Sequence, residues 1–397
     1  MAGRGKRPDP ELLAAHDSPS PFVRQRSLPL PVIRQTLLTW FRSGHRELPW
    51  RKERDPYAIW VSEIMLQQTR TETVKGYFSR FMERFPSVRT LATAPLDDVL
   101  ALWSGLGYYS RARNLHKAAQ QIVSLHDGRF PVEPAAIAAL PGIGPYTAGA
   151  IRSIALGQDA PILDGNVIRV LSRLFLLDER PESASGKRRY WSLAEALLPT
   201  ATLEAAQNDP GDLNQSLMEL GATVCLPRRP LCLTCPVAEH CQARQAGNPE
   251  DYPKAKAQRE VPSLRMVTLV LCHHDQVLMV RRPELGLWGG LWEPPTLSLQ
   301  PDETELAGLR RLVTTSLGTT LPVERALPLA PFGHILTHRN LRFAPFLLSL
   351  SQPPPLTLSG YLAHRFIDPQ KPQALGLSAW AAALLGRLPD EPTSPSP

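Results

Sequence analysis

The sequence predicts two domains of different class, an all-α domain followed by a smaller α+β domain. Apolar residues recur at three- and four-residue spacing up to about residue 245, which is typical of amphipathic helices. Short β-rich runs begin after residue 263. Residues 246–262, between the two halves, are rich in charge and proline and are expected to form a linker. At 397 residues the chain is long enough for each domain to have its own core.

The individual elements follow from these patterns. Within residues 57–68, apolar side chains at positions 57, 60, 61, 64 and 65 would share one helix face. The same spacing predicts helices over residues 96–103, 112–125, 190–198 and 213–224. In the second domain we expect a hairpin over residues 266–272 and 276–280, a helix over residues 303–317 and a strand over residues 343–350. Residues 1–30 are expected to be a flexible basic arm, and residues 389–397 a disordered tail.

Composition narrows the class of partner. The formal net charge of +7 favours an anionic partner, nucleic acid among them. No apolar run reaches the length of a membrane span, and no secretory signal is visible, so we expect a cytoplasmic protein without a membrane partner.

Four of the five cysteines, Cys225, Cys232, Cys235 and Cys241, are crowded into one short segment. Four thiolates can hold a zinc ion or an iron–sulfur cluster, whereas disulfides would need an oxidising compartment. Spacings of six, two and five residues are unusual for zinc, which favours iron–sulfur and leaves zinc open. Cys272, the fifth, lies in an expected strand and is expected to be a small core residue.

A glycine-rich segment at residues 140–148 is typical of a helix-hairpin-helix element. Gly142 and Gly144 carry no side chain, so backbone N–H groups there could approach a DNA phosphate. An ordinary turn between packed helices is the alternative. Asp164, further along, precedes an amphipathic helix and by itself would be interpreted as an N-cap.

Five motifs in order give a more specific resemblance. They are Leu48-Pro-Trp-Arg51, Asp55-Pro-Tyr57, Val61 to Thr69, Gly105 to Asn114, and Pro145 to Ile151. Together with the hairpin, Asp164 and the cysteines, residues 31–245 resemble MutY-type adenine DNA glycosylases of the helix-hairpin-helix superfamily. Residues 263–388 resemble that family's Nudix-like C-terminal domain, most clearly from Leu285 to Pro295. Endonuclease III, a related enzyme, has a catalytic lysine in the hairpin, and this chain has none there.

The resemblance implies a fold, a substrate and a cofactor. The fold is an all-α helix-hairpin-helix glycosylase domain with an iron–sulfur cluster loop at residues 225–241, plus a C-terminal α+β Nudix-like domain. The substrate is double-stranded DNA in which adenine is mispaired with 8-oxoguanine or guanine. The cofactor is one 4Fe-4S cluster held by the four cysteines, in a loop whose Arg228 and Arg229 would face phosphate. A monomer is expected, with repair partners unidentified.

The resemblance also assigns catalytic roles. Cleavage of an N-glycosidic bond needs a protonated leaving base and a stabilised cationic sugar, which two carboxyl groups in different protonation states can provide. Glu63 would be the acid, because apolar neighbours would favour its protonated form if it is buried. Asp164, kept ionised near a helix N-terminus, would stabilise the sugar. Tyr146 and Asn166 would support the two carboxyl groups.

Further residues are expected to bind DNA. Arg51 would help bind the extruded adenine, Gln68 and Tyr108 would wedge into the duplex, and Thr71 and Leu106 would line the same gap. Core packing is the alternative for Tyr108 and its neighbour Tyr109.

The C-terminal domain would read the opposite base through the segment from His334 to His338. Thr337 and His338 are the expected contacts, while Leu336 stands where the family has an aromatic residue, which puts stacking in doubt. A hairpin turn with a surface histidine is the alternative. The acidic run of active Nudix hydrolases is missing, so we expect no nucleotide pyrophosphatase activity. Two readings from other classes stay open: a glycosylase with β-lyase activity, and a lesion-binding protein without catalysis.

Overall fold

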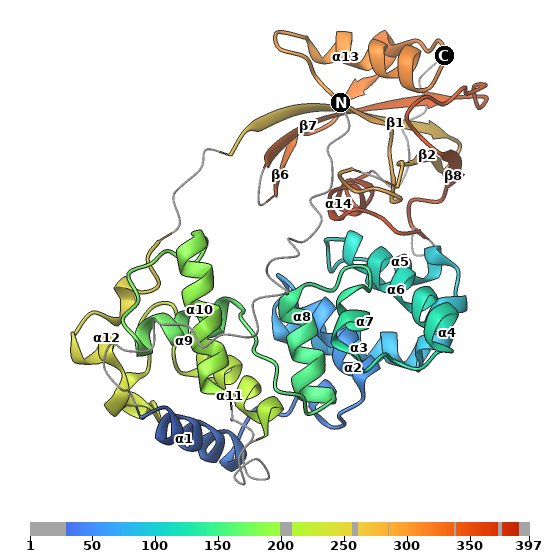
Figure 1. Cartoon of the computed structure of the whole chain (residues 1–397). Coiled ribbons are helices and arrows are strands. Elements are labelled where there is room, and N and C mark those ends of the chain that lie inside the picture. Colours follow the sequence, from blue (N-terminus) through green and yellow to red (C-terminus); the bar gives the residue numbers. More distant parts are fainter. Residues whose placement is uncertain are drawn as a thin grey trace. The chain divides into compact units, whose positions relative to one another are not determined.

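The computed structural model describes residues 29–198, 209–255, 261–284, 286–336, 339–371 and 375–388. Most of the expected N-terminal arm and the whole C-terminal tail lie outside these ranges. The chain divides into two compact units, each made of two separate stretches. Unit 1 combines Met1–Glu47 with Gly144–Lys256, and unit 2 combines Leu48–Ile143 with Ala257–Pro397 (Figure 1).

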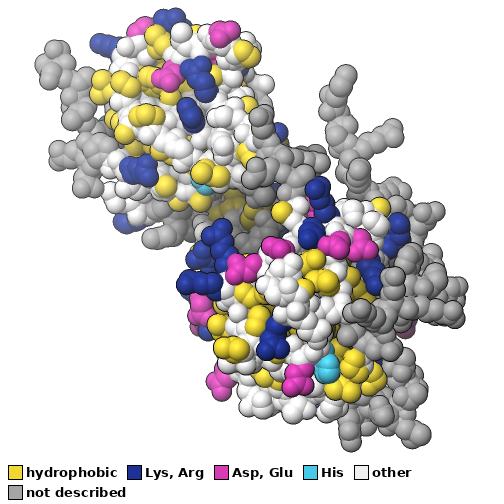
Figure 2. Space-filling model, turned by 90° about the vertical axis from the view of Figure 1, so that its left-hand side faces the viewer, with side chains coloured by type: hydrophobic (Ala, Val, Ile, Leu, Met, Phe, Trp, Pro, Cys, Tyr) yellow, Lys and Arg dark blue, Asp and Glu magenta, His cyan; other side chains and the backbone are white. Residues whose placement is uncertain are grey.

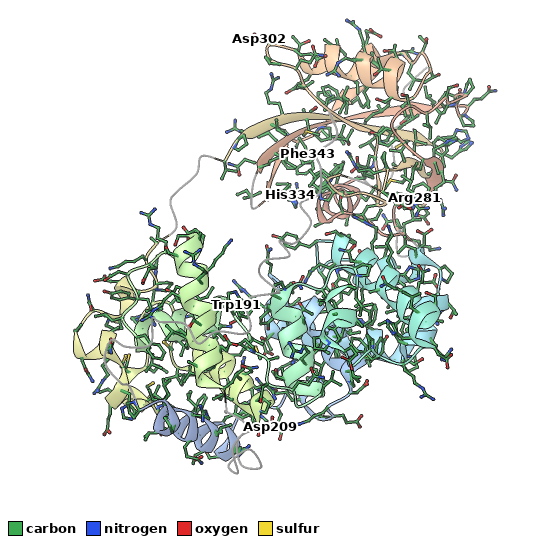
Figure 3. The ribbon with its side chains drawn as sticks, viewed as in Figure 1. Trp191, Asp209, Arg281, Asp302, His334 and Phe343 are labelled. Carbon is green, nitrogen blue, oxygen red and sulfur yellow. The ribbon has the colours of Figure 1, made fainter. Side chains whose placement is uncertain are left out.

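Unit 1 is helical. Its elements are α1 (Leu30–Ser43), α8 (Pro145–Ala150), η4 (Ile151–Ala155), α9 (Gly165–Leu174), α10 (Ala184–Leu197), α11 (Pro210–Thr223), η5 (Cys232–Thr234), η6 (Ala238–His240), α12 (Gln242–Gln245) and η7 (Pro249–Asp251). Local capping explains where several begin: Asp209, labelled in Figure 3, accepts hydrogen bonds from the first backbone N–H groups of α11.

Unit 2 starts with a second group of helices. These are η3 (Pro49–Arg51), α2 (Pro56–Leu66), α3 (Thr71–Arg84), α4 (Val88–Thr93), α5 (Leu96–Trp103), α6 (Ser110–His126) and α7 (Pro134–Ala138). Trp60, Phe81 and Trp103 are fully buried among them. The expected helix over residues 57–68 ends at Leu66 instead, because Gln67 has ψ 112° and Gln68 has φ 58°, which are not helical values.

The rest of unit 2 is a mixed sheet with helices, which confirms the α+β expectation. Its elements are β1 (Ser263–His273), β2 (Gln276–Arg281), β3 (Trp292–Glu293), β4 (Thr296–Ser298), α13 (Glu305–Arg311), η8 (Leu312–Ser316), η9 (Val323–Arg325), β5 (Leu327–Pro328), β6 (Phe332–Leu336), β7 (Arg339–Leu350), β8 (Ala363–Ile367) and α14 (Ala379–Leu385). The expected hairpin is confirmed, since β1 and β2 pair antiparallel with Cys272 opposite Val277.

Two cores lie on the two faces of this sheet. Side chains alternate along β1: Leu269 and Leu271 pack in one core with residues of α13 and η8, whereas Val270 and Cys272 pack in the other with residues of α14. In Figure 1, α13 and α14 accordingly lie on opposite sides of the sheet. Cys272 is 5% exposed, so its expected place in the core is confirmed.

The segment expected as a linker begins as part of unit 1. Tyr252 is 6% exposed, and its carbonyl accepts a hydrogen bond from Arg173 Nε at 3.0 Å. Lys254 Nζ lies 3.3 Å from Asp178 Oδ1. Residues 256–260 lie outside the described part of the chain. Within the described ranges, none of the helices has the length and apolar character needed to span a membrane.

Candidate active site

Asp164 caps the N-terminus of α9. Its Oδ1 accepts a hydrogen bond from Val167 N at 2.7 Å, and its backbone is extended (φ −107°, ψ −178°), as is usual at an N-cap. Capping therefore uses Oδ1 of the carboxylate, whereas Oδ2 has other contacts.

A path of hydrogen bonds connects that second oxygen with the cysteine segment. Asn166 Nδ2 donates to Asp164 Oδ2 at 3.1 Å. Arg169 Nη2 donates to Asn166 Oδ1 at 2.8 Å, and Arg169 Nε donates to the carbonyl of Cys225 at 2.7 Å. The arginine thus joins the first cysteine to the amide that contacts the candidate carboxylate.

The electrostatics of Asp164 differ from the sequence-based expectation. Burial raises the pKa of its carboxyl group, against the opposing effects of the Val167 and Asn166 hydrogen bonds and the charge of Arg169. The helix N-terminus favours the ionised form, as expected, but desolvation outweighs it.

All four clustered cysteines line one pocket. The pocket is formed by Arg173, Val224, Cys225, Pro230, Leu231, Cys232, Cys235, Ala238, Cys241, Arg244 and Pro249. In the described ranges no three His, Cys, Asp or Glu side chains are close enough to hold a single metal ion. Four thiols that line one pocket are a ligand set that can hold an iron–sulfur cluster.

Two of these thiols, those of Cys235 and Cys241, favour the protonated form when no metal is present. Burial raises the pKa of Cys235 to about 11, and the neighbouring cysteines add to the effect. Burial also raises the pKa of Cys241. Because metal ligands must be thiolates, filling the pocket would release these protons.

Arg173, on α9, connects the cysteine segment to the helices of unit 1 by hydrogen bonds. Its side chain is 2% exposed, and Nη1 donates to Cys225 Sγ at 3.3 Å and to the carbonyl of Leu226 at 2.7 Å. Nη2 donates to the carbonyl of Pro227 at 3.0 Å. A hydrogen bond to a ligand sulfur is the kind of contact that tunes and orients a metal centre.

Glu63 lies in unit 2, on the buried face of α2. Asp55 caps this helix by accepting from Tyr57 N at 3.2 Å and Ala58 N at 3.1 Å. The Glu63 side chain is only 4% exposed, so the condition set for the expected acid role, burial, is met. Arg51 is half-buried at the end of η3.

The expected wedge residues lie on two turns of unit 2. Gln68 is exposed and Tyr108 is 47% exposed, whereas Tyr109 is 5% exposed and packs in the core. The two adjacent tyrosines thus differ in exposure, with Tyr108 partly accessible and Tyr109 buried. Thr71 is half-buried as the first residue of α3. Leu106 is 6% exposed, so protein encloses most of its side chain.

The glycine-rich segment connects two short helices, α7 and α8. Gly142 has φ +80°, and a Cβ there would lie 2.7 Å from Asn114 Cβ, so both backbone conformation and space require glycine. A Cβ at Gly144, the N-cap of α8, would meet open space. Tyr146 follows in α8, and its hydroxyl lies 3.3 Å from Met218 Sδ.

His334 lies on β6, which pairs antiparallel with β7 (Figure 3). Its ring centroid is 6.0 Å from that of Trp288, and burial lowers the pKa of its imidazole. Phe343, labelled in the same figure, lies on the neighbouring strand β7. Its ring centroid is 6.4 Å from that of Trp288. Leu336, at the end of β6, is partly buried against this aromatic core. Thr337 and His338 lie outside the described residues.

Three arginines in these sites were missed in the sequence: Arg111, Arg169 and Arg173. Each lies on an otherwise amphipathic helix, where an arginine ordinarily faces solvent. Arg111 and Arg173 are instead 8% and 2% exposed. Their position close to a motif could have indicated a role in the site. Arg111 lies within the Gly105 to Asn114 block, and Arg169 follows Asp164 by five residues.

Surface charge does not concentrate in one band on the face that Figure 2 shows. Dark-blue Lys and Arg side chains are spread over it and alternate with acidic ones. Arg228 and Arg229 are exposed, and Arg229 N donates to Glu250 Oε1 at 3.0 Å. On this face, contacts with an anionic partner would involve separate basic groups.

Comparison with known proteins defines the class. A family model described as HhH-GPD superfamily base excision DNA repair protein matches residues 61–195, and a NUDIX domain model matches residues 266–387. The fold and these matches define a helix-hairpin-helix base excision DNA repair protein with a C-terminal Nudix domain.

Similar curated proteins narrow the class to one family. The chain is 36% identical over 413 residues to "Adenine DNA glycosylase" of Mus musculus, covering 90% of this chain and 78% of that protein. It is 34% identical over 411 residues to the Homo sapiens protein of that name, covering 90% and 74%. It is 33% identical over 321 residues to the protein of that name from Buchnera aphidicola subsp. Schizaphis graminum, covering 81% and 88%.

The chain belongs to the adenine DNA glycosylase family. It is an N-glycosylase that acts on DNA in base excision repair. The sequence-based resemblance, fold class and enzyme class are therefore confirmed.

Proposed function

We propose that this enzyme hydrolyses the N-glycosidic bond of adenine mispaired with 8-oxoguanine, and more slowly that of adenine mispaired with guanine. The observation that carries the proposal is Asp164 and its path of hydrogen bonds through Asn166 and Arg169. A residue that served only as an N-cap would need no second, side-chain-supported oxygen.

Glu63 is the proposed general acid. It is 4% exposed on α2, and burial of a carboxyl group in general favours its protonated form. It transfers its proton to adenine N7, so that the electrons of the breaking C1′–N9 bond leave with a neutral base. The resulting carboxylate then accepts a proton from the water that attacks C1′. Arg51 and Tyr146 support the extruded adenine and the acid.

Asp164 is the proposed stabiliser of the sugar cation. Its carboxylate is held by Val167 N and Asn166 Nδ2, so it needs little reorganisation as positive charge develops on the sugar. The described part of the hairpin contains no lysine, and the enzyme acts without an amine nucleophile as a monofunctional glycosylase.

The opposite base is read by the C-terminal domain, through Thr337 and His338. The resemblance to the family's reading segment supports this step, together with the placement of His334 on β6 leading toward it. Gln68 and Tyr108 enter the duplex while Thr71 and Leu106 line the gap, and Gly142 and Gly144 approach phosphate.

One 4Fe-4S cluster is the proposed cofactor, held by Cys225, Cys232, Cys235 and Cys241. When bound, it would fold a loop that is too short for a core of its own. Arg173 would orient Cys225 through its bond to Sγ. Iron and sulfide analysis with visible absorbance tests the assignment, and stoichiometric zinc without iron would overturn it.

The central test is adenine release from a defined duplex. Purified enzyme is incubated in excess with a duplex containing one adenine opposite 8-oxoguanine, followed by alkali. Cleavage of the adenine strand, faster than for adenine opposite guanine, is expected. Glu63→Gln should lose this activity. An intact adenine strand with the wild-type enzyme, or full activity of Glu63→Gln, would refute the proposal.

A further inference from the structure

Two turns of unit 2, residues 66–70 and 104–109, have backbone conformations that side chains disfavour. Gln68 has φ 58° and Tyr108 has φ 50°, both in the left-handed region, and Gly105 and Gly107 also have positive φ. Left-handed conformations of such residues persist only where the surrounding structure holds them in place. Something must therefore fix both turns.

One buried side chain does so. Arg111, near the start of α6, is 8% exposed. Its Nη1 donates to the carbonyls of Ile64, Met65 and Gln67 at 2.8, 2.9 and 2.6 Å. These bonds hold the carbonyl end of α2, which finishes at Leu66, and the residue directly before Gln68.

The other edge of the same guanidinium binds the second turn. Nη2 donates to the carbonyls of Leu106 and Gly107 at 3.2 and 3.1 Å, directly before Tyr108. It also lies 3.3 Å from Thr69 Oγ1, the residue after Gln68. Both turns are thus bonded to one rigid, planar group.

Aromatic rings complete the arrangement. Arg111 Cζ lies 5.5 Å from the ring centroid of Tyr108 and 5.4 Å from that of Trp103. Trp103 Nε1 donates to the carbonyl of Gly107 at 3.2 Å. The guanidinium therefore supports the exposed tyrosine ring as well as its backbone.

We propose that Arg111 is a positioning residue that holds Gln68 and Tyr108 as one two-part wedge, so that extrusion of the target base depends on it. This inference rests on the proposed function of the two wedge residues. A lysine could not replace the arginine, because an ammonium is a compact group that cannot span two turns with a planar fork of donors.

The test measures extrusion apart from base release. The target adenine opposite 8-oxoguanine is replaced by 2-aminopurine, whose fluorescence rises when it leaves the stack, and all proteins carry Glu63→Gln to prevent cleavage. Arg111→Lys and Arg111→Met are compared with the parent. Arg34→Met is the matched control, because Arg34 is also 8% exposed and also binds carbonyls at a helix end, those of Leu197 and Leu198, in unit 1.

Both Arg111 variants should reduce the fluorescence rise by about tenfold, as expected if only about a tenth of molecules keep both turns in place. Arg34→Met should match the parent. Hydrogen exchange should increase at residues 66–70 and 104–109 and not elsewhere in unit 2. If Arg111→Met does not fold, Arg111→Lys decides.

Other outcomes distinguish the role of Arg111 from the proposed function of the enzyme. A full fluorescence rise with a folded Arg111→Lys protein would overturn the positioning role while leaving the proposed function intact. No rise with the Glu63→Gln parent would overturn the wedge itself and the role of Arg111 with it. Adenine release by the wild-type enzyme reports separately on the proposed function.

Discussion

Asp164 is a residue on which folding and its proposed catalytic role make opposite demands. Burial raises the pKa of its carboxyl group, so the fold favours the protonated acid, whereas stabilisation of a sugar cation needs the carboxylate. Asn166 and Val167 keep the ionised form accessible through their hydrogen bonds. Such a residue lowers the stability of the fold where it is ionised, and the proposed role on the sugar would account for its presence.

Asp164→Asn should therefore separate activity from stability. Asparagine keeps the N-cap without the charge, so adenine release should fall about 10²- to 10³-fold, while the thermal midpoint at neutral pH should rise. The folded-state pKa is above the ordinary 3.8, so the contribution of Asp164 to stability is present below that value and lost as pH rises through the folded pKa. The two proteins should converge at low pH. A lower midpoint for the variant at neutral pH would contradict this reasoning.

Glu293, in the C-terminal domain, should make unfolding depend on pH. It is fully buried, and Arg282 Nη1 lies 2.6 Å from its Oε1. Burial raises its pKa to about 7 from 4.5, against the opposing charge of Arg282. Because the folded state binds this proton more tightly, stability should fall as pH rises from 4.5 through 7.

Glu293→Gln should remove that part of the pH dependence. Urea unfolding of both proteins at several pH values between 4.5 and 8 is the measurement. An unchanged slope in the variant would assign the effect to other groups.

At the scale of elements, local pattern predicted where helices and strands lie but not what ends them. The expected helix over residues 96–103 is α5 itself. The helix from residue 57 ends two residues early because Arg111, far along the chain, binds its last carbonyls. Motif order likewise predicted Asp164 and the cysteines as site residues. The hydrogen bond from Arg169 to Cys225, which connects them, joins residues 56 positions apart in the sequence. The spacing of residues along one helix carries no information about such a contact.

Arg169→Met tests that connection between α9 and the cysteine segment. Removing the guanidinium breaks its bonds to Asn166 and Cys225, so adenine release should fall about tenfold or more, the usual cost of losing an outer support of a site. Single-turnover rates and iron content per chain are measured together. Arg152→Met is a suitable control, because Arg152 Nε donates to Gln158 Oε1 in the same unit and, within the described ranges, its side chain bonds none of the site residues. Full activity in Arg169→Met would leave the path without a function.

At the scale of the whole molecule, the two candidate carboxyl groups come from different compact units, Glu63 from unit 2 and Asp164 from unit 1. Each unit thus contributes one of the two carboxyl groups of the proposed mechanism. If the two groups act in one bond-breaking step, their losses should not add, because removal of either already removes the concerted action. The double variant Glu63→Gln/Asp164→Asn should then release adenine no more slowly than the slower single variant. Multiplied rate losses in a folded double variant would show instead that the two carboxyl groups act independently.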